Sequence, residues 1–173
     1  MSALITQEFL RKGFLYEPET GDFYRKLKYG GWKIVGVTPN SDGYRRVGIF
    51  GTSYYIHRLI WLYMTGNWPP IDIDHVDRNP GNNRWNNLRL ASRSQNTINS
   101  RLLDRNTSGV RGVCWNPIKS RWMARISLNG VRRHLGYFDS IEEAEQVYLL
   151  AAAELHEEYA PSEVRLKLLE MIK

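Results

Sequence analysis

Residues 72–96 read DIDHVDRNPGNNRWNNLRLASRSQN and carry the densest cluster of reactive polar side chains in the chain. Asp74 and His75 are adjacent, Asn87 follows twelve residues after the histidine, and Asn96 follows nine residues after that. Such residues can supply a base that deprotonates water, oxygen ligands for a divalent cation, and a group that orients the base. A site of this composition can hydrolyse a phosphodiester bond.

The pattern around these residues predicts two strands followed by a helix. Residues 71–73 alternate between apolar and polar, PGNN is turn-forming sequence, and LRLA at 88–91 alternates again. A helix should follow because Ser92 or Ser94 can cap its first turn. Asn96 would then lie near the start of this helix and face back across the hairpin.

With this spacing, the stretch resembles the HNH endonuclease family, whose core is a ββα-metal fold. In that family the first His ends a strand, the central Asn begins the next strand, and the third motif residue projects from the helix. These positions fall on His75, Asn87 and Asn96, so the third position departs from the family's His. The resemblance is to the phage and homing nucleases that have Asn there.

The chemistry assigns a role to each of these side chains. His75 is the predicted general base, with its ring held by a backbone carbonyl or an amide. Asp74 and Asn96 are the predicted ligands of one divalent metal ion per active site, Mg²⁺ or Mn²⁺ rather than zinc, because their donors are oxygens. The resemblance implies that Asn87 braces the loop carrying His75 rather than touching substrate.

Other polar residues near the motif have competing interpretations. Asn99 shares a helix face with Asn96 and could approach the metal or a phosphate, or it could be a solvated helix residue. His57 could lie behind the metal site, or it could be a buried histidine with satisfied polar atoms that ties a helix to the hairpin. Turn formation alone explains a further group of residues: Asp77, Asn79, Asn82 and Asn83.

The length and composition favour two small domains of an α+β protein. With 173 residues, 42% of them hydrophobic, the chain can bury a core. We expect a β-rich N-terminal region leading into the ββα-metal motif, then a three-stranded antiparallel sheet packed on one helix. The predicted division follows in order: a nuclease domain at 1–100 with its metal core at about 70–100, a linker at 101–107, a DNA-binding domain at 108–160, and a tail at 161–173.

The same data exclude several classes of protein. No apolar run reaches membrane-spanning length and the first residues resemble no export signal, so we expect a cytoplasmic protein, in the host cell of a phage or mobile element. Cys114 is the single cysteine, which excludes an intramolecular disulfide and a cysteine-cluster zinc site. No membrane partner and no small-molecule cofactor are expected.

The net charge of +6 is distributed unevenly along the chain. Residues 1–100 carry 13 basic and 8 acidic side chains, residues 101–137 carry 8 and 1, and residues 138–173 carry 3 and 9. A concentrated positive segment indicates a polyanionic partner whose affinity falls as salt rises.

The basic segment lies within a stretch whose pattern predicts three short strands and then a helix. Turns are expected at NPIKS and LNG, and Ser140 and Glu143 form a capping box at the helix start. The helix has an apolar stripe that would cover one face of the sheet. Trp115 and Trp122 are expected in this core. The opposite face would present alternating polar side chains: Arg125, Ser127, Arg132 and His134, with Asn116 and Lys119 nearby.

Residues 108–160 resemble the plant APETALA-type (ethylene-response-factor) DNA-binding domain, through RGV, W-x-A-x-I, R-x-x-LG-x-F-D and an EEA-containing helix. The resemblance implies that the sheet lies in the major groove, with Arg111, Arg125, Arg132 and His134 contacting DNA. Cys114, Asn116 and Ser127 stand where plant members usually have arginines, and His134 stands in place of Trp. The alternative for these residues is a solvated sheet face.

These features together predict a metal-dependent endonuclease that nicks or cleaves double-stranded DNA. The C-terminal sheet would select the sequence while the metal hairpin cuts, and the protein would act as a monomer or as a dimer induced by DNA. One alternative is a DNA-binding regulator that does not cleave and keeps the nuclease as a scaffold. Another is an RNA-binding protein, although the chain lacks the aromatic signatures of common RNA modules.

Overall fold

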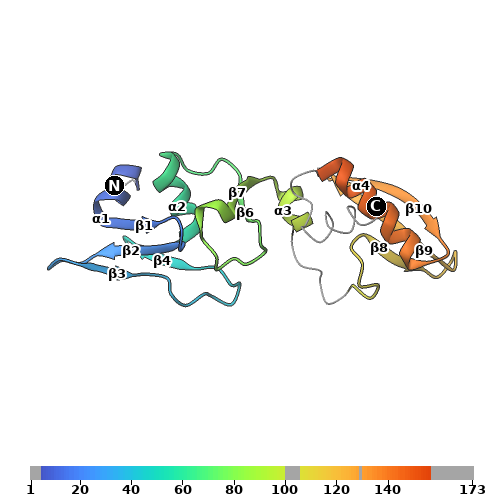
Figure 1. The fold of residues 1–173 in the computed structure, drawn as a ribbon, viewed down its shortest axis with the longest axis horizontal. Coiled ribbons are helices and arrows are strands. Elements are labelled where there is room, and N and C mark those ends of the chain that lie inside the picture. The colour runs from blue at the N-terminus through green and yellow to red at the C-terminus, as the bar shows by residue number, and fades with distance from the viewer. Residues whose placement is uncertain (1–4, 100–105, 129, 157–173) are drawn as a thin grey trace. The chain divides into compact units, whose positions relative to one another are not determined.

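The computed structural model describes residues 5–99, 106–128 and 130–156. The chain divides into two compact units, Met1–Ala91 and Ser92–Lys173. Each unit combines short antiparallel strands with helices (Figure 1), so the predicted α+β class is confirmed. Most of the predicted linker and all of the predicted tail lie outside the described residues, and the predicted domain boundaries stay a prediction.

The first unit begins with a short helix and a three-stranded sheet. Helix α1 (Gln7–Gly13) is capped by Thr6, whose hydroxyl accepts a backbone N–H of the first turn at 3.2 Å. Strands β1 (Phe14–Glu17), β2 (Asp22–Lys26) and β3 (Trp32–Ile34) follow and pair in that order, each antiparallel to the next. The turn between β1 and β2 is important for the site described below.

A second hairpin leads into the main helix of this unit. Strands β4 (Arg46–Ile49) and β5 (Thr52–Tyr55) pair with each other, and α2 (Ile56–Thr65) continues directly from β5. The helix ends where Gly66 adopts a left-handed conformation with φ 80°, which glycine tolerates without steric cost.

The third hairpin contains the motif residues. Strand β6 (Asp72–His75) pairs antiparallel with β7 (Leu88–Ala91), and a short 3₁₀ turn, η1 (Trp85–Asn87), precedes β7. Asp74 lies opposite Arg89 in this register. The two strands that the sequence predicted are therefore confirmed.

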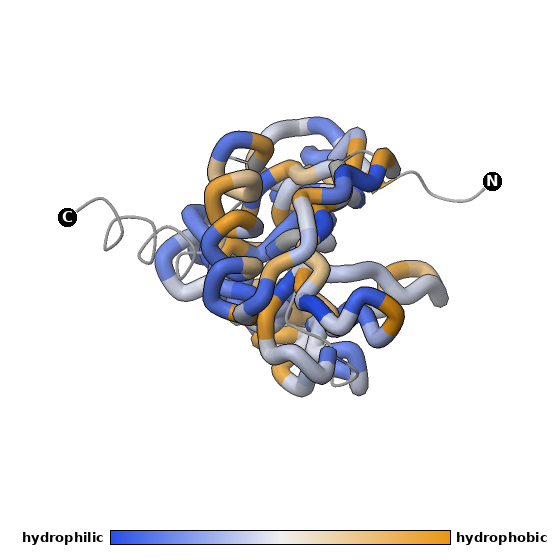
Figure 2. The backbone as a smooth tube through the Cα atoms, turned by 90° about the vertical axis from the view of Figure 1, so that its right-hand side faces the viewer, coloured by the Kyte–Doolittle hydropathy of each residue, from blue (hydrophilic) through white to orange (hydrophobic). Residues whose placement is uncertain are grey.

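Apolar residues from all three hairpins and both helices form one core in the first unit. The backbone in Figure 2 alternates between hydrophobic and hydrophilic stretches, as half-buried elements do. On α2 the fully buried Ile56, Leu59 and Ile60 recur at helical spacing, and each such side chain contributes about 1.5–3 kcal/mol by burial. The other fully buried members are Leu10 and Phe23.

The second unit begins with α3 (Arg93–Asn99), which follows β7 in the chain. Gln95 N donates to Ser92 Oγ at 3.3 Å and Ser92 N donates to Gln95 Oε1 at 2.7 Å, which is a reciprocal capping box. Of the two serines that the sequence offered as caps, Ser92 is the one used.

A three-stranded antiparallel sheet and one helix make up the rest of what the structure describes of the second unit, as predicted. Strands β8 (Val113–Asn116), β9 (Arg121–Leu128) and β10 (Val131–Phe138) are arranged with β9 in the centre. Helix α4 (Ile141–His156) packs across all three strands (Figure 1). Glu143 N donates to Ser140 Oγ at 3.1 Å and so caps this helix. The buried core of this unit consists of Val113, Ala124, Ile126, Ala144, Tyr148 and Ala152.

One core prediction for this unit is wrong. Trp115 is 48% exposed, although its ring contacts the ring of Trp122 at 5.3 Å between centroids. The reason is its place on β8, an edge strand, where a large side chain has neighbours on one flank only. Trp122, on the central strand, packs against the core as predicted.

None of the helices within the described part of the chain combines the length and the hydropathy needed to cross a bilayer.

Candidate active site

Asp74 is a buried carboxylate held by a cross-strand arginine. Its side chain is 4% exposed. Arg89 Nε and Nη2 both donate to Asp74 Oδ2, at 2.9 and 2.7 Å. A buried charge is tolerated only with such a partner, because desolvating an isolated carboxylate costs several kcal/mol. The hairpin register therefore explains how the Asp74 carboxylate can be buried, because it places Arg89 opposite Asp74.

His75 is the next residue on β6 and is equally buried, at 4% exposure. Its Nε2 lies 3.1 Å from Asn83 Oδ1. An amide oxygen only accepts, so Nε2 carries the proton and the lone pair is on Nδ1 in the neutral ring. Burial lowers the pKa of His75, while the bond to Asn83 and the carboxylates of Asp77 and Asp74 act in the opposite direction. The net effect favours the neutral, proton-accepting form.

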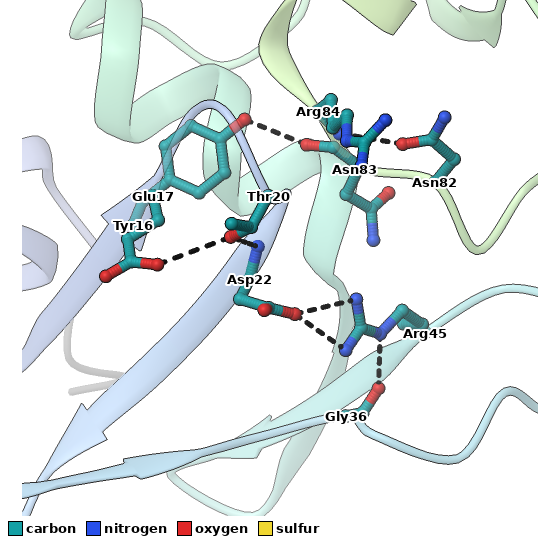
Figure 3. Close-up of polar contacts among 9 residues, drawn as sticks. All are labelled: Tyr16, Glu17, Thr20, Asp22, Gly36, Arg45, Asn82, Asn83 and Arg84. Carbon is teal, nitrogen blue, oxygen red and sulfur yellow. Dashed lines mark hydrogen bonds and ion pairs between the residues drawn. The ribbon is translucent and has the colours of Figure 1, made fainter.

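Asn83 is held by Tyr16 of strand β1, as Figure 3 shows. Tyr16 Oη donates to the Asn83 carbonyl at 2.8 Å, and Asn83 is only 1% exposed. Gly21 has φ +78°, and a Cβ there would lie 2.6 Å from the backbone of Asn83 and of Arg84. The N-terminal hairpin thus approaches Asn83 so closely that only glycine fits, and it holds the residue that orients His75.

Asn87 ties together the loop that leads from His75 to Asn83. Its Oδ1 accepts from Asp77 N at 3.0 Å, and its Nδ2 donates to Asp77 Oδ1 at 2.9 Å and to the Asn82 carbonyl at 2.8 Å. These contacts are of the kind that the resemblance implied for a bracing residue. Asp77 also accepts hydrogen bonds from Asn79 and Asn82. Burial raises the pKa of Asp77, but the hydrogen bonds together lower it by more. The net shift of the pKa is therefore downward.

His57, at the start of α2, packs directly against His75. Their ring centroids are 5.3 Å apart with the planes at 85°, and the rings of Tyr44 and Tyr55 lie 5.2 and 5.3 Å from that of His57. His57 is 6% exposed and its Nδ1 has no hydrogen-bond partner among the described residues. Burial, followed by the charges of His75 and Arg58, lowers its pKa to about 3. The prediction of a histidine with satisfied polar atoms is therefore wrong, and a role of His57 behind the metal site stays a prediction.

The donors predicted for a metal ion lie on different units. Asp74 is on β6 of the first unit, and the half-buried Asn96 is on α3 of the second. A carboxylate and an amide oxygen are suitable ligands for Mg²⁺ or Mn²⁺. Within the described residues no group of three His, Cys, Asp or Glu side chains could hold a metal. The joint binding of an ion by Asp74 and Asn96 stays a prediction.

Asn99 also lies on α3 and is 2% exposed. The alternative that it is a solvated helix residue is therefore wrong. Its approach to a metal ion or a phosphate stays a prediction.

The residues predicted to contact DNA lie in three places in the second unit. Arg111, Arg125 and Arg132 line one pocket. Asn116 ends strand β8 and Lys119 lies in the turn that follows, where Asn116 Oδ1 accepts from Lys119 N at 3.0 Å. His134 is exposed on β10, and its ring contacts that of Tyr137 with centroids 4.6 Å apart and the planes tilted by 52°. A role in DNA binding stays a prediction for all six.

Sequence reasoning missed two residues that shape the site. Asn83 was explained as a turn former, yet its side chain bonds His75. Arg89 was not singled out, yet it holds Asp74. The hairpin register could have identified Arg89, because it predicts which residue lies opposite Asp74. No local signal distinguishes Asn83 from the other asparagines of the turn.

Comparisons with known proteins show which proteins this chain is similar to. A family model described as HNH endonuclease matches residues 54–98. Protein 3.8 of Escherichia phage T7 is 31% identical over 105 residues, which cover 60% of this chain and 86% of that protein. An uncharacterised HNH endonuclease of Acanthamoeba polyphaga mimivirus is 36% identical over 107 residues, covering 61% of this chain and 54% of the viral protein.

A solved structure of the HNH homing endonuclease I-HmuI, described for its DNA binding and cleavage, is also similar to this chain. It shares 22% identity with this chain, with a TM-score of 0.43, and the similarity covers 82% of this chain and 76% of that one.

Proposed function

Because the chain belongs to the HNH endonuclease family, we propose that it is a metal-dependent endonuclease that cuts double-stranded DNA by hydrolysing a phosphodiester bond. The observation that carries this proposal is the geometry of His75, a neutral imidazole held at Nε2 by Asn83 next to a buried carboxylate. We place its action in the cytoplasm of a host cell, since a phage and a giant virus encode similar proteins.

His75 is the general base of this proposal. Its Nδ1 takes a proton from the attacking water, and Asn83 keeps Nε2 protonated so that the ring cannot present the wrong nitrogen. The lowered pKa of His75 keeps the base form populated at neutral pH. Asn87 maintains the loop between His75 and Asn83 through its three hydrogen bonds and makes no contact with the reacting atoms.

Asp74 and Asn96 would hold one Mg²⁺ or Mn²⁺ ion through their side-chain oxygens. When bound, such an ion stabilises the negative charge that develops on the phosphate oxygens. Arg89 fixes the orientation of the Asp74 carboxylate through Oδ2. His57 supports the ring of His75 from behind, as a positioning residue.

The basic segment at 101–137, within the second unit, would supply most of the contacts with DNA, through Arg111, Arg125 and Arg132, with His134, Asn116 and Lys119 as further contacts. Two weak binding elements on one chain act as a tight binder because the second is kept near the DNA by the first. One centre of this kind acts on one phosphate, so a double-strand break would require a dimer or a second binding event.

A second candidate is a DNA-binding regulator that does not cleave. The observation that favours it is the ion pair of Asp74 with Arg89 at 2.7 Å, which already neutralises the carboxylate as a structural ion pair does. In an active enzyme, Asp74 must bind the metal ion while it keeps its ion pair with Arg89.

Incubation of a supercoiled plasmid with the protein and Mg²⁺ or Mn²⁺ separates the two candidates. We expect the wild type to relax or linearise the plasmid and His75→Ala to lose at least about 100-fold in rate, the usual contribution of a general base. His156→Ala, at the last residue of α4, is the matched control and should cleave like the wild type. Full activity of His75→Ala refutes the assignment of His75 as the general base. A wild-type protein that binds DNA but cleaves it with none of the divalent metals supports the regulator.

A further inference from the structure

The second unit contains a pocket of about 690 Å³ that the proposed reaction does not use. Its lining comes from α3, from the residues leading into β8, from strands β9 and β10 with the turn between them, and from Tyr148 of α4. We call it the arginine pocket, since its described lining includes four arginines: Arg93, Arg111, Arg125 and Arg132.

Among the described residues, the lining of the arginine pocket has a concentrated positive charge and no carboxylate. Within the described residues, Arg93, Arg125 and Arg132 form no ion pair with an acidic side chain. Ser94 and Ser127 add hydroxyl groups to the same wall. Like charges that lie close together repel one another, so an anion in the pocket would be stabilised by Arg93, Arg125 and Arg132 together.

The register of the sheet brings two of these arginines to one face. Arg132 lies opposite Ser127, and Arg125 lies opposite His134. Residues two apart on a strand share a face, so Arg125 and Ser127 point to the same side, away from the buried Ala124. Arg125 of β9 and Arg132 of β10 thus lie on the face of the sheet opposite the buried Ala124. A ligand on that face can contact both guanidinium groups.

Helix α3 is tied to this face by Arg111. Its Nη1 donates to the Thr97 carbonyl at 3.2 Å. The next residue, Gly112, accepts a hydrogen bond from Arg125 N at 2.8 Å, and a Cβ there would lie 2.3 Å from the Tyr148 ring. The close approach of the chain at Gly112 therefore places Arg111 beside β9. Because Arg111 bonds Thr97 of α3, Arg93 on the same helix lies in the same pocket.

We propose that the arginine pocket binds a backbone phosphate of duplex DNA, with Arg93 of α3 and Arg132 of β10 among its contacts. The proposal rests on the proposed function, because it takes DNA as the ligand. Guanidinium groups pair with phosphate through parallel N–H bonds, and such contacts position a protein on a duplex without reading its sequence. One stretch of backbone would thus hold the sheet together with the helix that carries Asn96.

The test is the salt dependence of DNA binding by the full chain without divalent metal. Each phosphate contact contributes about 0.9 to the slope of log K against log salt. A fourfold rise in salt therefore weakens binding about 3.5-fold for each contact. We expect Arg93→Gln and Arg132→Gln each to reduce the slope by about one contact, and Arg93→Lys to keep most of it because the positive charge remains.

Arg133→Gln is the matched control. It removes one positive charge from β10, as Arg132→Gln does, but on the opposite face of the sheet. Equal slopes for Arg93→Gln, Arg132→Gln and Arg133→Gln overturn the pocket while leaving the proposed function intact. A wild-type chain that binds no duplex DNA refutes both proposals. Added inorganic phosphate should compete only weakly, and competition as strong as that of DNA would show a site for the free ion instead. Melting curves of the variants verify that each is folded.

Discussion

Acidification should destabilise the first unit through His57. The side chain is buried, and its pKa lies at about 3 in the folded protein against 6.5 for an unperturbed histidine. Between these two values the unfolded chain binds a proton at this position and the folded chain does not. The stability that the neutral ring allows is thus fully present above pH 6.5 and is lost as the pH falls toward 3.

The size of the effect follows from the shift in pKa. Each pH unit within this window changes the free energy of unfolding by about 1.4 kcal/mol. Between pH 7 and pH 4 the loss at His57 is therefore about 3 kcal/mol. This is a large part of the total stability of a small domain, about 5–15 kcal/mol.

The assay is urea denaturation at several pH values, followed by NMR resonances of the first unit so that unfolding of this unit is measured by itself. His57→Gln removes the titrating group, so its free energy of unfolding should fall by about 3 kcal/mol less than that of the wild type between pH 7 and pH 4. His134→Gln, at an exposed position on β10, is the matched control. An unchanged pH dependence in His57→Gln would refute the reasoning.

Two further substitutions test how the loop between the strands of the motif is supported. Gly21→Ala should cost about 2–4 kcal/mol, because it adds a clash with the backbone of Asn83 to the left-handed strain. Gly30→Ala has a similar φ and open space, so it should cost only about 1–2 kcal/mol, and equal urea midpoints for the two would contradict the close approach. Asn87→Ala should lower the free energy of unfolding by about 3 kcal/mol, because three hydrogen bonds are lost. It should also lower kcat with little change in KM for DNA. A rise in KM alone would show that Asn87 binds substrate.

Local patterns predicted most elements of the fold because each depends on neighbours in sequence. Ser92 and Ser140 cap their helices through bonds to residues three positions later, and alternation located β7 and β9. The burial of Ala144 and Tyr148 follows from helical periodicity in the same way. These features could be predicted because the atoms that stabilise them lie within a few residues of one another.

The support of the candidate site could not be predicted in this way. Asn83 bonds His75 from within a turn that contains several similar asparagines, and Tyr16, far away in sequence, determines which of them is held. His57 lacks a partner at Nδ1 because the rings of Tyr44, Tyr55 and His75 surround it.

The sequence alone determined the types and spacing of the reactive side chains and the elements on which they lie. The tertiary structure determined which nitrogen of His75 bears the proton, which residue neutralises Asp74, and which arginines share a pocket. These outcomes depend on contacts between segments distant in the chain, where packing distances and desolvation decide the result and local periodicity carries no information.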